Sequence, residues 1–236
     1  MSCIFRYTLG PVKDLGLIIL KESIRKLKTI YPEFDIVICH NQLNDKQLNF
    51  IKKLKVHLHE QKYNGIGYKP TVENWKMYPQ RLDITKHEIV MDNDIVLFDK
   101  FEEIDNFLIS NNSTLTAEDT SRNLGKYDKF LKLKNGLNCG IFGMPPGFDF
   151  SLKMNEMCQK DTIKKWTKRY DDQGIISAAM SNHPYCIIIP LKKLPILSPQ
   201  NEIPDNEEIK GIHFAYSNRS NYHRPWIDYV NRNINI

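Results

Sequence analysis

Apolar and polar residues follow two alternating patterns along this chain, which predict strands and helices in turn. Apolar side chains recur at helical spacing across residues 14–31, and Pro32 ends that run. Short apolar runs on either side of it predict strands. The first half is predicted to contain strands at 3–9, 34–40, 55–59 and within 88–98, and helices at 14–31, 45–54 and, apart from Pro79, 72–82. Strands that alternate with helices favour an α/β fold with a mostly parallel sheet.

The second half of the chain is less regular, but it contains segments of both kinds. Residues 121–134 are polar and are expected at the surface, and residues 199–206 are a predicted loop. The remaining elements are predicted strands at 113–117, 136–143, 185–189 and 211–214 and predicted helices at 104–109, 150–167 and 174–180. No internal repeat and no linker rich in Pro, Gly or Ser divides the chain, so we expect residues 1–236 to form one domain.

An acidic triplet, Asp92-Asn93-Asp94, lies where one apolar run stops and the next begins. Carboxylates at positions i and i+2 of an extended chain point to the same side, where they would repel each other unless a cation lay between them. Oxygen ligands suit Mg²⁺ or Mn²⁺, and such an ion would bridge a diphosphate. His213, on the last predicted strand, would favour Mn²⁺ as a third ligand. An acidic turn and a structural histidine are the alternative interpretations.

Ligands of an open α/β sheet bind in a crevice at the carboxyl ends of the strands. The acidic triplet and the segment Tyr7-Thr8-Leu9 both lie at such ends, so we expect them to face one crevice. Three cations precede the triplet in the sequence, and each is a candidate for contact with a phosphate: Lys69, Lys76 and Arg81.

Several polar residues of the second half are candidates for contacts with a sugar or a phosphate. Asn138 could bind a sugar hydroxyl while Gly140 leaves room for the ring, although a β-bulge at Gly140 would explain the same pattern. The Asp-Asp-Gln segment at 171–173 is typical of a helix N-cap, but a carboxylate and an amide there would also bind sugar hydroxyls. Arg224, within Arg-Pro-Trp, is either a cation for a phosphate or an ordinary surface side chain.

Composition and charge narrow the classes of function. The net charge is +5 and the basic residues are scattered, which argues against nucleic-acid binding and is compatible with a sugar diphosphate as ligand. The N-terminus lacks the features of a signal peptide, and no apolar run approaches the roughly 20 residues that span a bilayer. The five cysteines are expected as free thiols, without a disulfide framework or a zinc site. We therefore expect a soluble, cytoplasmic protein, and a homodimer stays open.

Taken in order, these segments resemble GT-A glycosyltransferases of the glycogenin and bacterial galactosyltransferase type, the family-8 group. The matching segments span nearly the whole chain: Tyr7-Thr8-Leu9, Met91-Asp92-Asn93-Asp94, residues 137–143, Asp172-Gln173, and residues 211–214 followed by Arg224-Pro225-Trp226. The resemblance implies a single-domain GT-A fold, with a nucleotide-binding half at 1–100 and an acceptor and donor-sugar half at 101–236. It also implies a retaining transferase that uses a UDP-sugar, with Mn²⁺ (or Mg²⁺) on the diphosphate.

The resemblance also implies roles for individual side chains. Those roles are metal ligands at Asp92, Asp94 and His213, contacts to uridine and ribose at Tyr7, Thr8 and Asn93, and contacts to the donor sugar and reaction centre at Asp119, Asn138, Asp172 and Gln173. Arg224 stands where the family has a lysine before Pro-Trp. The family reaches that lysine within a few residues of its histidine, whereas residues 215–223 intervene here.

The chemistry leaves two stereochemical courses open. An inverting enzyme would need a carboxylate base, for which Asp119 is the best candidate, whereas a retaining one can use the leaving phosphate with Asp172 or Gln173 nearby. The resemblance implies retention. Alternative functions are a catalytically silent nucleotide-sugar-binding protein and a sugar nucleotidyltransferase, although the latter would need a Gly-rich basic loop that residues 10–13 do not supply. The donor (UDP-glucose, UDP-galactose or UDP-N-acetylglucosamine) and the hydroxyl acceptor are not distinguished.

Overall fold

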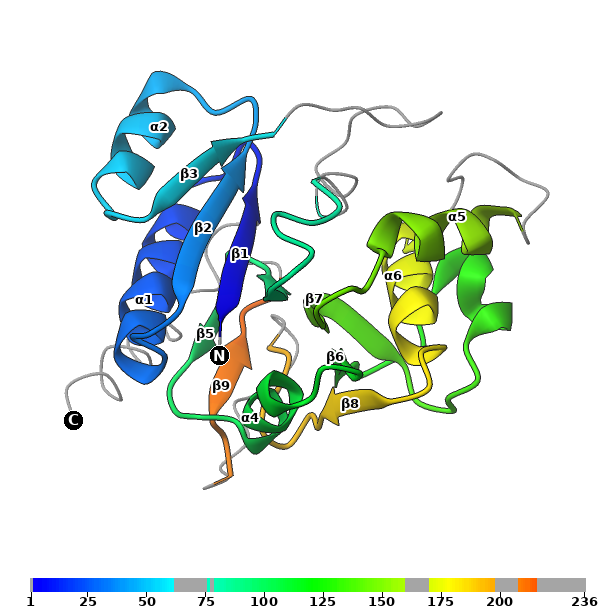
Figure 1. The fold of residues 1–236 in the computed structure, drawn as a ribbon. Coiled ribbons are helices and arrows are strands. Elements are labelled where there is room, and N and C mark those ends of the chain that lie inside the picture. The colour runs from blue at the N-terminus through cyan, green and yellow to red at the C-terminus, as the bar shows by residue number, and fades with distance from the viewer. Residues whose placement is uncertain (1, 62–75, 77–78, 160–169, 198–207, 216–236) are drawn as a thin grey trace.

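The computed structural model describes residues 2–61, 76, 79–159, 170–197 and 208–215 (Figure 1). Its strands are β1 (Cys3–Leu9), β2 (Asp35–His40), β3 (His57–Glu60), β4 (His87–Met91), β5 (Ile95–Leu97), β6 (Thr114–Glu118), β7 (Leu137–Met144), β8 (Cys186–Ile189) and β9 (Gly211–His213). Its helices are α1 (Asp14–Ile30), α2 (Asp45–Lys52), α4 (Glu102–Ile109), α5 (Phe150–Gln159) and α6 (Asp171–Ser181), with a 3-10 helix η1 (Gly125–Phe130). No helix in these ranges is long and apolar enough to cross a membrane.

Seven of the strands form one sheet in the order β3-β2-β1-β4-β7-β6-β8. Strand β7 runs antiparallel to both of its neighbours, and every other neighbouring pair is parallel. The predicted α/β fold with a mostly parallel sheet is therefore confirmed. Parallel pairing of β1 with β4 places Tyr7 beside Met91, so the ends of these strands are neighbours, as predicted.

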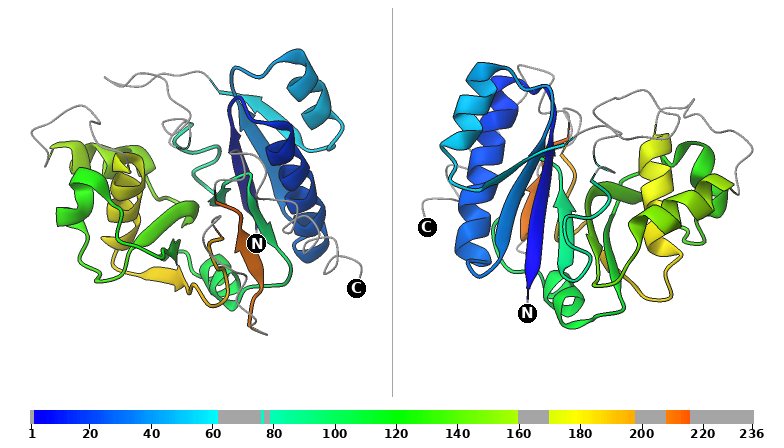
Figure 2. Two further views of the ribbon diagram at one scale, coloured as in Figure 1. Left: turned by 180° about the vertical axis from the view of Figure 1, so that it is seen from behind. Right: turned by 45° about the horizontal axis from the view of Figure 1, so that its top comes forward.

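Helices cover both faces of this sheet (Figure 2). Alternate residues of each strand point to opposite faces, and the two faces bury different apolar clusters. Helix α1 contributes Leu20 to a cluster with Tyr7 of β1, whereas α6 contributes Ile176 to a second cluster with Val90 of β4 and Phe142 of β7. The full burial of such side chains, each stabilising the fold by roughly 1.5–3 kcal/mol, fixes the strand ends rigidly in place.

Strands β5 and β9 form a separate antiparallel pair, in which Ile95 lies opposite His213. The apolar run at 88–98 is therefore two strands in two sheets, and the acidic triplet is the link between them. A consequence is that the last strand of the described chain is brought beside the triplet.

The structure bears on two further predicted segments, each in part. Most of the polar segment 121–134 is half-buried or exposed, as predicted, but its apolar side chains Leu124, Tyr127 and Leu131 are buried, and Tyr127 packs in the cluster beneath α6. Only residues 76 and 79–82 of the predicted helix at 72–82 are described, and 79–82 are not helical. Pro79 removes a backbone donor there, which disfavours a helix.

The N-cap, which was one of the two interpretations of residues 171–173, is wrong. Helix α6 begins at Asp171, and its cap is Tyr170, which has a left-handed backbone with φ of 73°. The Asp171 carboxylate instead accepts a hydrogen bond of 2.8 Å from the backbone N–H of Lys126, and so ties α6 to η1. The predicted loop at 199–206 lies outside the described residues, as does the helix predicted at 150–167 beyond Gln159.

Candidate metal and donor site

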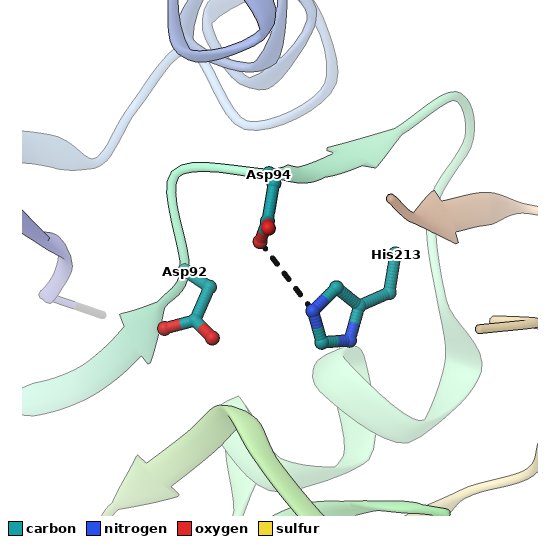
Figure 3. A group of neighbouring side chains, drawn as sticks. All are labelled: Asp92, Asp94 and His213. Atoms are coloured by element: carbon teal, nitrogen blue, oxygen red, sulfur yellow. Dashed lines mark ion pairs between the residues drawn. The ribbon is translucent and has the colours of Figure 1, made fainter. Parts of the chain in front are cut away.

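Three side chains converge between the two sheets: Asp92, Asp94 and His213 (Figure 3). The aspartates lie in the link between β4 and β5, and His213 ends β9. One ligand atom from each lies within 4.8 Å of the others, and His213 Nε2 is 3.4 Å from Asp94 Oδ1. The structure thus brings together the residues predicted as metal ligands, across a turn rather than along one extended strand.

This donor set fits a hard divalent cation. Ligands on opposite sides of one Mg²⁺ or Mn²⁺ ion are roughly 4.2 Å apart, because each bond is about 2.1 Å long, so the observed separations need only small adjustments. Carboxylates suit Mg²⁺ and Mn²⁺ alike, whereas the imidazole favours Mn²⁺ over Mg²⁺. Asp92, Asp94 and His213 could therefore hold Mn²⁺.

Charges around the cluster compensate one another. Burial raises the pKa of Asp92, and the ammonium of Lys76, 2.8 Å from Asp92 Oδ2, opposes that rise. Burial alone would lower the pKa of His213, but the hydrogen bond and the charge of Asp94 outweigh it, so that the pKa is raised. The site therefore attracts positive charge, which a divalent cation would supply.

Gly140 on β7 makes room for the imidazole of His213. A Cβ atom at this position would lie 2.7 Å from His213 Cε1 and 2.6 Å from Asn138 Oδ1. The backbone carbonyl of Gly140 also accepts a hydrogen bond of 2.7 Å from the N–H of Asp92. The space that the sequence suggested for a sugar ring is thus occupied by a candidate metal ligand. The predicted irregularity lies nearby, where the pairing of β6 with β7 shifts register at Ala117 and Asn138.

Asp119 gathers two amide side chains into a second polar cluster. Its Oδ2 accepts hydrogen bonds from Asn138 Nδ2 at 3.1 Å and from Gln173 Nε2 at 2.9 Å. Asn138 Oδ1 in turn accepts from the N–H of Gly140 at 2.7 Å. Asp119, Asn138 and Gln173, all predicted at the reaction centre, are thus connected to one another. Through Gly140 they are also connected to Asp92, one of the three candidate metal ligands. Asp172 lies at the same helix start, and its charge acts on Lys76.

Lys76 and Cys139 lie between these two clusters. Lys76 Nζ is 3.7 Å from Cys139 Sγ, which is 4.0 Å from Gln173 Oε1. Burial lowers the pKa of Lys76, but the Asp92 carboxylate outweighs it, so that the pKa is raised and the side chain stays cationic. Burial raises the pKa of the Cys139 thiol to about 12. Cys139 was not predicted as a site residue, and the one available signal was its place between Asn138 and Gly140.

The predicted nucleotide contacts at the end of β1 point to opposite faces of the sheet. Tyr7 and Leu9 point into the core, and the Tyr7 hydroxyl lies 2.7 Å from Ser23 Oγ, so neither side chain is available to a ligand. Thr8 points to the opposite face, where its Oγ1 is buried and makes no hydrogen bond with the described part of the chain. Asn93 Nδ2 donates to the carbonyl of Gly16 at 3.3 Å.

The remaining predicted cations have other surroundings. Arg81 donates to Glu88 Oε2 and to four backbone carbonyls, those of Asp83, Lys86, Pro145 and Phe148. These contacts give Arg81 a structural environment rather than the expected phosphate-binding one. Lys69 and Arg224 lie outside the described residues. Of the predicted cations, Lys76 is therefore the one that the described structure places at the candidate metal ligands.

Neither a protein-family model nor a curated protein matches this sequence. Solved structures do match. The galactosyltransferase LgtC in complex with donor and acceptor sugar analogues matches with a TM-score of 0.56 and 10% identity over 91% of this chain and 87% of that chain. An active-site variant of LgtC, in which glutamate replaces a glutamine, has the same TM-score and identity.

Two further matches are glycosyltransferases. The bifunctional glycosyltransferase WbbM matches with a TM-score of 0.62 and 10% identity, over 98% of this chain but only 51% of that one. Mouse xyloside xylosyltransferase 1 matches with a TM-score of 0.58 and 12% identity over 92% and 99% of the two chains. Likeness at such identities is evidence of fold, and the resemblance read from the sequence is confirmed at that level. The chain has the GT-A glycosyltransferase fold.

Proposed function

We propose that this protein is a metal-dependent glycosyltransferase that moves a sugar from a UDP-sugar to a hydroxyl acceptor with retention of configuration. One observation carries the proposal: on a GT-A fold, Asp92, Asp94 and His213 meet at the carboxyl end of β4. In open α/β sheets, ligands bind at this edge. Residues 1–100 would supply most nucleotide contacts, and residues 101–236 the contacts to the sugar and the acceptor.

The residues around the metal cluster suit the diphosphate of such a donor. A divalent cation bound by the cluster would supply Lewis-acid neutralisation of charge on the departing nucleotide. Lys76, 2.8 Å from Asp92, would donate a charged hydrogen bond to a diphosphate oxygen as the glycosidic bond breaks. The Oγ1 of Thr8, near the end of β1, and the side chain of Asn93, in the link after β4, would contact the nucleoside.

The hydrogen bonds of Asp119 favour retention. Its Oδ2 accepts from both Asn138 and Gln173, and its Oδ1 accepts from the N–H of Ser121 at 3.3 Å. A carboxylate whose oxygens already accept hydrogen bonds is better suited to orienting those amides than to removing a proton from an acceptor. We therefore assign Asp119 to orientation, and leave proton removal to the departing phosphate.

Gln173 is the residue best suited to the reaction centre itself. Its Nε2 is fixed by Asp119 and by the carbonyl of Asn123, which turns Oε1 toward Cys139 and the space beside Lys76. An amide oxygen held in this way would stabilise positive charge as it builds on the anomeric carbon. The active site of LgtC also contains a glutamine. Asp172 would contact sugar hydroxyls from the same helix start.

Release of UDP from a panel of UDP-sugars (UDP-glucose, UDP-galactose and UDP-N-acetylglucosamine), with and without Mn²⁺, tests this function. We expect Mn²⁺-dependent release that Asp92→Asn abolishes, while Asp14→Asn, an exposed aspartate paired with Lys46, leaves it unchanged. The anomeric configuration of the product, followed by NMR, tests retention. Release that is independent of metal would contradict the proposal. Mn²⁺-dependent binding of UDP without turnover of any donor would instead indicate a silent nucleotide-sugar-binding protein.

A further inference from the structure

A buried ion pair lies on the large sheet, next to the segment that carries Lys76. Arg6 of β1 and Glu88 of β4 have fully buried side chains, and Arg6 Nη1 is 2.7 Å from Glu88 Oε1. Both side chains point to the face opposite α1, since Phe5 and Tyr7, on either side of Arg6, pack in the α1 cluster. Two opposite charges inside otherwise apolar strands therefore face the same side as Lys76.

This pair holds the segment that carries Lys76. Arg6 Nη2 donates to the carbonyl of Lys76 at 2.8 Å, and Arg6 Nη1 also donates to the carbonyl of Pro79. Glu88 Oε2 accepts from the N–H of Leu82 at 2.8 Å. The guanidinium of Arg6 thus holds the start of this segment at Lys76, and the carboxylate of Glu88 holds its end at Leu82.

We propose that Arg6 is a positioning residue, which fixes the backbone of Lys76 so that its ammonium reaches the nucleotide diphosphate. This inference rests on the proposed function. A lysine side chain has four rotatable bonds, so the place of its Nζ depends on how firmly its backbone is held. Here the residue whose ammonium lies 2.8 Å from Asp92 is the residue whose carbonyl Arg6 binds.

Stability alone does not explain the pair. A buried ion pair adds little to stability compared with apolar residues of similar size, because both charges lose their hydration. The planar guanidinium, in contrast, supplies several donors in a fixed geometry, which here reach one carboxylate and two carbonyls. A lysine at position 6 would keep the charge but could not reproduce this geometry.

A double-mutant cycle on nucleotide affinity tests the inference. Calorimetric titration of UDP in the presence of Mn²⁺ compares wild type, Arg6→Lys, Lys76→Met and the double variant. We expect Arg6→Lys to weaken binding about tenfold, the equivalent of about 1.4 kcal/mol, and to have no further effect once Lys76 is methionine. Lys193→Met breaks a partly buried ion pair with Glu103 elsewhere and should leave the affinity unchanged. Independent, additive effects of Arg6 and Lys76 would overturn the inference.

A second measurement needs no nucleotide. Mass spectrometry gives the rate at which an amine-reactive acyl ester modifies Lys76, relative to Lys193, in the folded protein. We expect Arg6→Lys to raise this ratio, and an unchanged ratio would overturn the anchoring. If Arg6→Lys does not fold, Arg6→Gln, which leaves Glu88 paired with Arg81, takes its place in both measurements. A wild-type protein that binds no uridine nucleotide would overturn the proposed function, whereas the labelling ratio decides the anchoring separately.

Discussion

The substitution Gly140→Ala tests whether β7 shapes the metal cluster. The added Cβ would lie 2.7 Å from His213 Cε1, where ordinary contact begins at 3.4 Å, so the imidazole would have to move by about 0.7 Å. That shift is about a third of a metal–ligand bond of roughly 2.1 Å. Displacing groups that orient a metal ligand commonly weakens metal binding about 10- to 100-fold. We expect a loss of this size in the affinity for Mn²⁺, measured by calorimetry.

Gly143→Ala is the matched control on the same strand. Its added Cβ would lie 2.8 Å from Phe107 Cζ and 2.9 Å from Leu115 Cβ, in the core and away from the metal cluster. Overpacking of this kind costs about 1–3 kcal/mol of unfolding free energy, so both variants should be less stable. Only Gly140→Ala should lose affinity for Mn²⁺. Wild-type affinity in Gly140→Ala, or an equal loss in both variants, would refute the reasoning.

Other predictions concern the reaction centre, the core and the dependence of stability on pH. Asp119→Asn should lower kcat about a hundredfold through misplacement of Gln173 while UDP affinity is kept, and equal losses in both would contradict this. Tyr7→Phe removes a buried hydrogen bond to Ser23 and should cost about 1 kcal/mol in chemical denaturation without changing UDP affinity. Burial lowers the pKa of His87 in the folded protein below its ordinary value of 6.5. The neutral imidazole therefore contributes its full share of stability above pH 6.5, and this share is lost as the pH falls from 6.5 through the folded-state pKa. His87→Gln should therefore make unfolding free energy less dependent on pH below 6.5, and an unchanged slope would exclude this origin.

Local patterns in the sequence predicted most of the first half of the fold. The apolar spacing at 14–31 corresponds to α1, Asp14–Ile30, because one face of the helix is buried along its whole length. The burial of Tyr127, in contrast, was not predicted, because no local pattern indicates it. The apolar residues around it are few among charged ones, and they are buried only because α6, some 45 residues later, packs over them. Sequence spacing contains no direct information about such a partner.

The parts of the candidate site formed by polar residues at the ends of predicted strands could be predicted from the sequence. The parts that depend on which residues of neighbouring strands lie opposite each other could not. Asp92, Asp94 and His213 have residue types and positions from which a metal site was predicted, and the structure places one ligand atom of each within 4.8 Å of the others. Arg6 and Glu88 gave a weaker signal, a single charge within each of two apolar strands. Their relation follows from the register of β1 with β4, where Ile4 lies opposite Glu88 and Arg6 opposite Val90. That register depends on the whole sheet rather than on either segment alone.

The three candidate metal ligands, Asp92, Asp94 and His213, lie where the chain passes from the large sheet to the small one. This explains why they come from such distant parts of the sequence. Met91 ends β4 in the large sheet and Ile95 begins β5 in the small one, so the acidic triplet turns between two rigid supports. Strand β9 pairs with β5, which puts His213 opposite Ile95, and Gly140 of β7 lets the imidazole approach. Each candidate ligand thus lies at or beside the end of a different strand, so changes in the packing of the small sheet should alter metal affinity.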